Sequence, residues 1–468
     1  MKNILYLLFV YMLLPLEAYA HGFGERIDLP IPLNIYLIGA GVAVAVSFIL
    51  MGFIGKKEIG DDTYPRYNLF KVRWIKKVLE DRFFLGSIQA FFVLVLLLVI
   101  TAGFIGRQNS AFNIAPTVIW ILFGVGMTYT VISIGNLWRV INPWRTLFVW
   151  LERIIPDVSL KKSWPVVLGV WPAFVLFFGY RWVENVFPNA ANPSTLSLLI
   201  VLYSFITLGG MMYFGKVNWL RYGDPFSVFF RFLSYFSLTE RRVIENRKEL
   251  LVRPPGIGLL KRVRIGASEM TFVLFMISSV TFDGMLSIPL WQSIYRTLFK
   301  LGVPSLLIGT IGLLLLLLIF LGVYLFFSFL VKIYARTRKS SLEVAYAFVL
   351  SLLPIAIAYE LAHFMSLILI EGQRIFYLVS DPFGFGWNLF GTVEYAINFQ
   401  VINLKNLWNW QVGVIVLGHI IAVYISHMIA LRLFKDKKNA LRSQYPMLIL
   451  MVFYTVFSLW IMAQPIII

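Results

Sequence analysis

Long apolar stretches, separated by shorter polar segments, dominate the pattern of hydrophobic and polar positions along the chain. A helix needs about 20 apolar residues to cross the ~30 Å hydrocarbon core of a bilayer. The stretches do not alternate apolar and polar positions, so a transmembrane β-barrel is excluded. We therefore predict an all-α polytopic transmembrane bundle. Its ten predicted spans lie near residues 32–54, 84–105, 117–138, 165–183, 194–214, 270–290, 303–332, 343–371, 410–433 and 446–466.

The first twenty residues have the pattern of a secretory signal peptide. Lys2 supplies the positive charge, residues 4–16 are apolar, and Ala18-Tyr19-Ala20 forms an A-x-A cleavage site. The alternative is an uncleaved anchor helix. Cleavage would leave residues 21–468 as a single helical membrane domain with His21 as its first residue.

The distribution of charge predicts how the bundle sits in the membrane. Only 14% of the residues are charged, against about 25% in soluble domains, and the net charge is +18. If the mature N-terminus is outside, the inner loops hold 33 of the 41 Lys and Arg residues and the outer side holds 7. This bias predicts a prokaryotic cytoplasmic-membrane protein with both mature termini outside. The positive charge then faces anionic lipid, and nucleic-acid binding is not expected.

Ionisable residues inside apolar spans are the candidate functional residues, because a bilayer tolerates them only for a structural or chemical reason. Glu360 and His363 are three residues apart in the eighth span and so share a helix face. Glu-x-x-His is a spacing that binds metals inside helical bundles. Counted from span ends near Glu371 and Gln411, His363 and His419 each lie eight residues, or ~12 Å, deep. We therefore expect the two histidines to face each other in the outer half of the bilayer.

An N-terminal histidine would extend this site. It offers its α-amine and a ring nitrogen to one metal, an arrangement that Cu(II) favours. The predicted metal ligands are His21, Glu360, His363 and His419. Asp283 of the sixth span is a further ligand or a close neighbour, and Asp283 and Glu360 are the candidate catalytic carboxylates. Copper is the expected metal, with zinc or haem b as alternatives.

Other features leave alternatives open. His427 lies eight residues beyond His419 and is expected to be a packing residue. Asn142-Pro143 and Asp224-Pro225 follow the third and fifth spans, and they mark either a weak repeat of amphipathic segments on the inner surface or a coincidence. The aromatic loop 372–409 is either a lid or a folded-back interfacial loop. The chain has no cysteine and no P-loop, G-x-S-x-G or H-E-x-x-H motif, so thiolate sites and these enzyme classes are not expected.

Four segments together resemble a known family. They are HGFGERIDLPIP at 21–32, NPWRTL at 142–147, AYELAHF at 358–364 and DPFGFGW at 381–387. The chain resembles a prokaryotic family of polytopic membrane proteins often labelled fenitrothion hydrolase, an organophosphate ester hydrolase. The resemblance implies hydrolysis of an aryl phosphotriester, for which metal-activated hydroxide is a plausible nucleophile. It assigns no catalytic residue, and a two-metal hydrolase normally gathers more carboxylates and histidines than these spans contain.

Three classes of function remain at this point. The first is a metal-dependent membrane enzyme that acts on a small-molecule substrate at an outward-facing site. The second is a proton-coupled permease in which Glu360, Asp283 and His363 form the proton path. The third is a structural or assembly factor whose histidines only pack against neighbouring helices.

Overall fold

The computed structural model of the protein describes residues 32–54, 64–244, 247–261, 263–434 and 436–463. Within these ranges, ten helical stretches are long and apolar enough to cross a membrane. The chain is thus an all-α polytopic membrane protein, as the hydropathy pattern predicted. The signal peptide and His21 lie outside the described residues.

Seven of these ten spans are uninterrupted α-helices. They are α2 (Leu33–Ile54), α4 (Arg82–Ile105), α10 (Pro193–Phe214), α13 (Ala267–Leu286), α15 (Ser305–Tyr334), α20 (Leu404–Leu433) and α21 (Lys437–Met462).

The other three spans are composite. The third joins α5 (Ile114–Pro116), the π-helical η3 (Thr117–Met127) and α6 (Thr128–Ser133). The fourth joins the short 3₁₀ turn η4 (Val166–Leu168) to α9 (Trp171–Val186). The eighth joins α16 (Ser341–Phe348), the 3₁₀ turn η7 (Val349–Leu352) and α17 (Leu353–His363).

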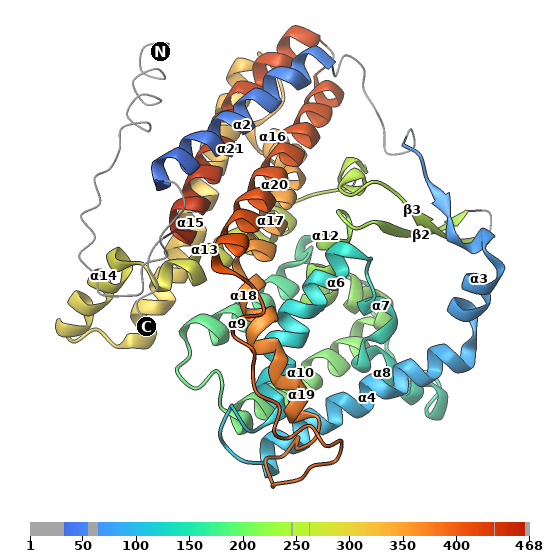
Figure 1. The fold of residues 1–468 in the computed structure, drawn as a ribbon. Helices are drawn as coiled ribbons and strands as arrows, with labels where there is room; N and C mark the ends of the chain where they lie inside the picture. The colour runs from blue at the N-terminus through green and yellow to red at the C-terminus, as the bar shows by residue number, and fades with distance from the viewer. Residues whose placement is uncertain (1–31, 55–63, 245–246, 262, 435, 464–468) are drawn as a thin grey trace.

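The spans form two groups that meet along α13 (Figure 1). One group contains α2, α15, α17, α20 and α21, and the other contains α4, α6, α9, α10 and the short helix α12 (Pro225–Ser234). Helix α13 packs against α15 and α17 on one side and against α9 on the other. At this junction Phe177 of α9 stacks on Phe229 of α12 at 4.8 Å and on Phe272 of α13 at 5.0 Å between ring centroids.

Two short helices between spans begin in the same way. The side chain of Asn142 caps α8 (Pro143–Ile154), which follows α7 (Trp138–Ile141), and the side chain of Asp224 caps α12. Each helix has proline as its first residue, where the missing N–H costs nothing. Burial of the second helix contradicts one of the two alternatives, an amphipathic segment on the inner membrane surface. Most of α12 is buried, and Phe226 packs against Tyr180, in the middle of α9, because this helix is apolar on nearly every face.

Two spans begin earlier than their apolar stretches indicate. Helix α20 begins at Leu404 and α21 at Lys437, where the side chains of Asn403 and Asp436 accept hydrogen bonds from the first turns. Polar first turns of this kind extend a helix beyond its apolar part, so hydropathy alone places the start too late.

The segment between α19 (Arg374–Leu378) and α20 folds back onto the connection between α4 and α5. The N–H groups of Arg107 and Ile114 donate to Phe383 and Pro382 at 2.8 and 3.1 Å. The Asp381 carboxylate accepts the N–H groups of Phe385 and Gly386 and so closes a tight turn. These bonds favour the folded-back interpretation of this loop over a lid.

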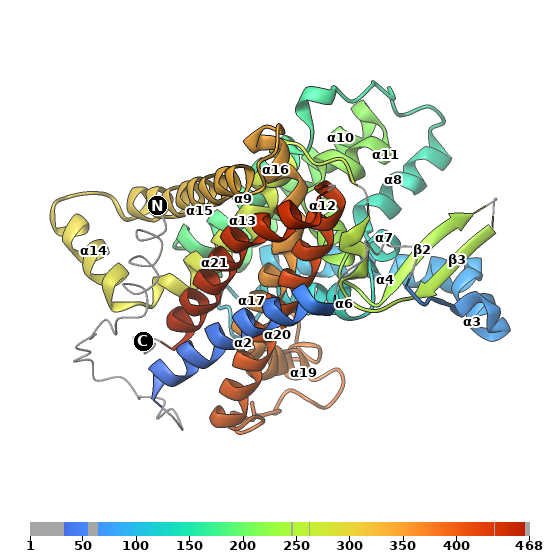
Figure 2. The same ribbon diagram turned by 90° about the horizontal axis from the view of Figure 1, so that it is seen from above.

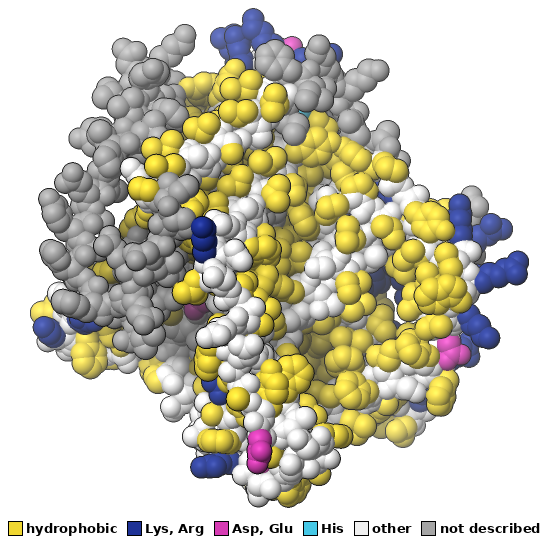
Figure 3. Space-filling view, viewed as in Figure 1, with side chains coloured by type: hydrophobic (Ala, Val, Ile, Leu, Met, Phe, Trp, Pro, Cys, Tyr) yellow, Lys and Arg dark blue, Asp and Glu magenta, His cyan; other side chains and the backbone are white. Residues whose placement is uncertain are grey.

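A small antiparallel sheet projects from one edge of the helices (Figure 2). Strand β3 (Arg247–Val252) lies between β1 (Tyr67–Asn68) and β2 (Thr239–Ile244). Two short helices, η2 (Leu69–Lys71) and α3 (Arg73–Glu80), follow β1 and lead into α4. In Figure 3, hydrophobic side chains cover most of the described surface in view, and Lys and Arg gather mainly at its right edge and upper end.

Candidate functional site

A buried arginine lies between two glutamates at the junction of the two helix groups. Arg181 and Glu184 are three residues apart on α9, and Arg181 Nη1 donates to Glu184 Oε2 at 2.7 Å. Arg181 Nη2 donates to Glu360 Oε1 of α17 at 2.5 Å. Arg181 is 5% exposed and Glu360 is 2% exposed. Because burial removes nearly all of the hydration of these charged groups, each of them depends on its ion-pair partner.

The next turn of α17 brings a histidine to the carboxylate of the sixth span. His363 Nε2 donates to Asp283 Oδ2 of α13 at 2.7 Å. The two side chains are 23% and 27% exposed, so this pair is the accessible part of the site. Asp283 thus lies beside His363, as the sequence predicts, and Glu360, one turn earlier on α17, is bonded to Arg181.

Two buried polar atoms of this cluster have no hydrogen-bond partner among the described residues. They are the hydroxyl of Tyr359 and Nε of Arg181. A Cβ at Gly284 would lie 2.8 Å from the Tyr359 hydroxyl and 3.6 Å from His363 Cε1, so the hydroxyl faces the same space as the Asp283–His363 pair. Buried polar groups nearly always have partners, so these atoms are suited to a polar ligand.

The cluster is rich in acid groups. Three carboxylates, on Glu184, Asp283 and Glu360, share one arginine and one histidine. If all three are ionised, the net charge is −2 with a neutral His363 and −1 with a protonated one. Uncompensated charge is costly within a membrane-spanning bundle. The arrangement therefore favours uptake of protons or of another cation.

His419 does not lie at the level of His363. Gln411 of α20 donates to the carbonyl oxygen of Ala362 at 2.9 Å, which places Gln411 beside the end of α17. A Cβ at Gly418 would touch Ala358 and Pro354, two turns further along. His419 is therefore about eight residues, or ~12 Å, from the level of His363. The predicted common depth is wrong because α20 begins at Leu404, so Gln411 is two turns inside the helix instead of at its end.

The ring of His419 has one satisfied and one free nitrogen. Nδ1 lies 2.8 Å from the carbonyl oxygen of Ile415, and the buried Nε2 has no partner among the described residues. His427 Nδ1 lies 2.8 Å from Gln444 Oε1 of α21, in agreement with a packing role.

The predicted metal ligands are thus spread over several environments. Glu360 is paired with Arg181, His363 with Asp283, and His419 lies deeper. In the described part of the chain, no group of three or more His, Cys, Asp or Glu residues is arranged to hold a metal ion. His21 lies outside that part, so a site for copper, zinc or haem b that includes it stays a prediction.

Sequence reasoning missed Arg181 and Glu184. By its place near the end of the fourth predicted span, Arg181 is one of the seven charges that the sequence assigns to the outer side. A signal was present, since Arg181 and Glu184 have the i,i+3 spacing that puts both side chains on one helix face.

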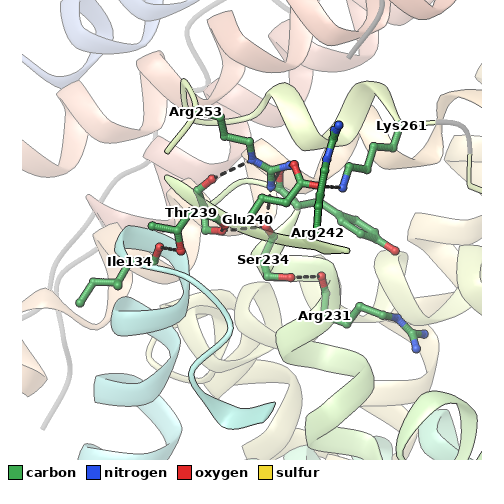
Figure 4. Close-up of polar contacts among 10 residues, drawn as sticks. Ile134, Arg231, Ser234, Thr239, Glu240, Arg242, Arg253 and Lys261 are labelled. Carbon is green, nitrogen blue, oxygen red and sulfur yellow. Dashed lines mark hydrogen bonds and ion pairs between the residues drawn. The ribbon is translucent and has the colours of Figure 1, made fainter. Parts of the chain in front are cut away.

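A second charge cluster joins the sheet to α12 (Figure 4). Arg253 Nη1 and Arg242 Nε donate to the Glu240 carboxylate at 2.6 and 2.7 Å, and Lys261 also bonds to it. Arg253 Nη2 also donates to the carbonyl oxygen of Ser234, the last residue of α12. Partial burial of Glu240 raises its pKa, but the hydrogen bonds from Arg242 and Lys261 and the charge of Arg253 outweigh this and lower the pKa to about 2. This cluster is structural, because its carboxylate is saturated by cations.

Comparisons with protein-family models, curated proteins and solved structures found no match to this chain. The function is therefore inferred from the chemistry of the site.

Proposed function

We propose that the protein is a proton-coupled permease of a prokaryotic cytoplasmic membrane. The observation that carries this proposal is that carboxylates outnumber basic side chains in the buried cluster, where Glu184, Asp283 and Glu360 share Arg181 and His363. Such intramembrane groups are typical of proton relays in transporters. The Lys and Arg distribution supports an orientation in which the Asp283–His363 pair faces the outer side.

The interrupted helices around the cluster support the same proposal. Transporter sites typically lie where spanning helices are broken, between two groups of helices. Here η7 interrupts the eighth span, and α17 ends at His363 before α18 (Met365–Ile370) begins. The third span, which contacts α18, contains the π-helical η3. Irregular helical segments of this kind often occur at functional sites.

Each residue then has a defined role. His363 accepts a proton from the outer side, and Asp283 orients its ring and stabilises the charged form. Glu360 is the deeper proton acceptor, and Arg181 holds it through Nη2 in its deprotonated form. On protonation of Glu360, Glu184 stays as the charged partner of Arg181 among the described residues. The bond between α9 and α17 thus depends on the protonation state.

A flux assay in sealed vesicles tests the proposal. The protein is reconstituted with a pH-sensitive dye inside the vesicles, and a small-molecule extract of the source cells is added outside. We expect proton uptake that depends on the extract, and we expect Asp283→Asn and Glu360→Gln to reduce it to the rate of empty vesicles. Glu371→Gln is the matched control, because the partner of Glu371 in the described part of the chain is the nearby Arg374, outside the cluster. Uptake that is the same in wild type and in empty vesicles would contradict the proposal.

A metal-dependent membrane enzyme is the second candidate, and the geometry of His419 favours it. A histidine that binds a metal usually donates its other ring N–H to a carbonyl or carboxylate. His419 has this arrangement with Ile415, and His363 has it with Asp283. Because ~12 Å separates the levels of His363 and His419, a single copper or zinc ion would take one of these two histidines as ligand, together with His21 at the N-terminus, for the ester hydrolysis that the family resemblance implies.

Metal analysis and N-terminal sequencing test this second candidate. We expect bound metal in the wild type and less in either His363→Ala or His419→Ala, together with a mature chain that begins at His21. Equal metal content in all three proteins would exclude the site, and a start at Met1 would exclude His21 as a two-nitrogen ligand.

A further inference from the structure

The short helix α3 has two chemically different faces, and neither is covered by the described chain. Trp74, Ile75, Val78 and Leu79 share one face by their i,i+4 spacing, whereas Arg73, Lys76 and Lys77 lie on the other. No residue of α3 is buried. Trp74 is 70% exposed, and Val78 and Leu79 are also exposed. An apolar face of this kind is removed from water only when another apolar surface covers it.

The position of α3 identifies that surface. Only Asp81, the N-cap of α4, separates α3 from this membrane span. Phe83, in the first turn of α4, is 86% exposed. Helix α3 therefore lies where a spanning helix enters the bilayer. Tryptophan is favoured at this level, because its amphipathic ring fits the boundary between headgroups and hydrocarbon. Phenylalanine is typical of the apolar face of helices at the same boundary.

The charge of this segment complements an anionic membrane surface. Residues 64–82 contain six Lys or Arg residues and two acidic residues. The basic face of α3, together with Phe70, lines an open groove of about 450 Å³ that also carries Glu80 and Asp81. A basic face opposite an apolar one is the pattern of helices that lie in the plane of the interface.

We propose that α3 is an amphipathic anchor that binds the anionic lipid surface at the inner face of the membrane. Trp74 and Val78 insert among the upper acyl chains, and Arg73, Lys76 and Lys77 bind lipid phosphates. The anchor holds the sheet, since β1 precedes η2 and α3 and pairs with β3. The sheet in turn is tied to α12 through Glu240 and Arg253 (Figure 4). Lipid binding at α3 therefore stabilises the position of a helix that packs beside Arg181.

Single-cysteine labelling tests this proposal directly, because the natural chain contains no cysteine. Trp74→Cys and Val78→Cys report on the apolar face, and Lys77→Cys is the matched control on the opposite face of the same helix. Each full-length variant carries an environment-sensitive fluorophore. The variants are reconstituted in vesicles of phosphatidylcholine alone or with phosphatidylglycerol. Quenching is measured with lipids that carry a nitroxide on the upper part of an acyl chain and with aqueous iodide.

We expect labels at 74 and 78 to be quenched by the lipid nitroxide several-fold more than the label at 77, and more strongly in anionic vesicles. Adding Lys76→Glu and Lys77→Glu to Trp74→Cys removes the effect of phosphatidylglycerol, since each basic residue near an anionic surface changes partitioning about fivefold. Equal lipid quenching at 74 and 77 would overturn the anchor. Protection from both quenchers would also overturn it, because that result would mean a protein surface covers α3.

Discussion

Arg181 is predicted to stabilise the protein only while both of its glutamate partners are charged. Arg181→Gln removes the charge that bonds Glu184 at 2.7 Å and Glu360 at 2.5 Å, and both bonds lie in the interior. Removing one partner of a buried ion pair costs about 3–5 kcal/mol, because the remaining charge stays buried without compensation. Here two carboxylates lose their common partner. We therefore expect a loss at the upper end of this range and a clear fall in the thermal midpoint.

A set of combined variants separates this electrostatic cost from lost packing. Glu360→Gln and Glu184→Gln are added to Arg181→Gln, and unfolding in detergent is followed by fluorescence-detected size exclusion. We expect the triple variant to recover most of the lost stability, since no charge then stays unpaired. Glu371→Gln is the control and should leave the midpoint unchanged. If the triple variant is as unstable as Arg181→Gln alone, the loss comes from packing and the electrostatic reasoning is wrong.

Two further predictions concern the scaffold. The pKa of Glu240 is lowered to about 2, so the contribution of its ion pairs to stability is complete above about pH 4.5 and is lost as the pH falls towards 2. An acid titration of the thermal midpoint should show this loss in wild type and not in Glu240→Gln, and identical profiles for the two proteins would contradict the prediction. Gly418→Ala places a Cβ 2.3 Å from that of Ala358 and should destabilise the contact of α17 with α20 by about 1–3 kcal/mol. In the control Gly413→Ala, on the same helix, the new Cβ meets nothing within 4 Å and should cause no loss of stability. Equal thermal midpoints for the two variants would show that α17 and α20 do not pack this closely.

The fold could be predicted from sequence because membrane-spanning helices depend on length and apolar content. All ten expected spans have counterparts among the described helices. The errors lie where polar residues extend or interrupt a helix. Asn403 and Asp436 start helices earlier than hydropathy indicates, and α12 is buried although it lies between two spans. Hydropathy measures transfer to lipid, and it does not register capping or burial against protein.

The candidate site could be predicted only in part for the same reason. Asp283, Glu360 and His363 were found because charged residues within apolar stretches stand out. Arg181 was not found, since a charge near a span end looks like an interfacial residue until its partner on another helix is known. The predicted level of His419 is wrong because hydropathy places the start of α20 too late, and this error shifts every depth counted along the helix. Contacts between helices depend on register, which a single sequence does not contain.

The Arg181–Glu360 bond suggests how protonation would be coupled to movement. This bond joins α9 of one helix group to α17 of the other, whereas Arg181 and Glu184 belong to the same helix. Glu360→Gln imitates the protonated acid and should loosen the contact between the groups. Asn189→Cys, between α9 and α10, and Leu404→Cys, at the start of α20, are exposed positions for a pair of spin labels in this cysteine-free chain. We expect a broader or longer distance distribution in the Glu360→Gln protein and in wild type at acid pH, with no change in Glu371→Gln. Identical distributions in all three proteins would mean that the bond holds the fold together without acting as a switch.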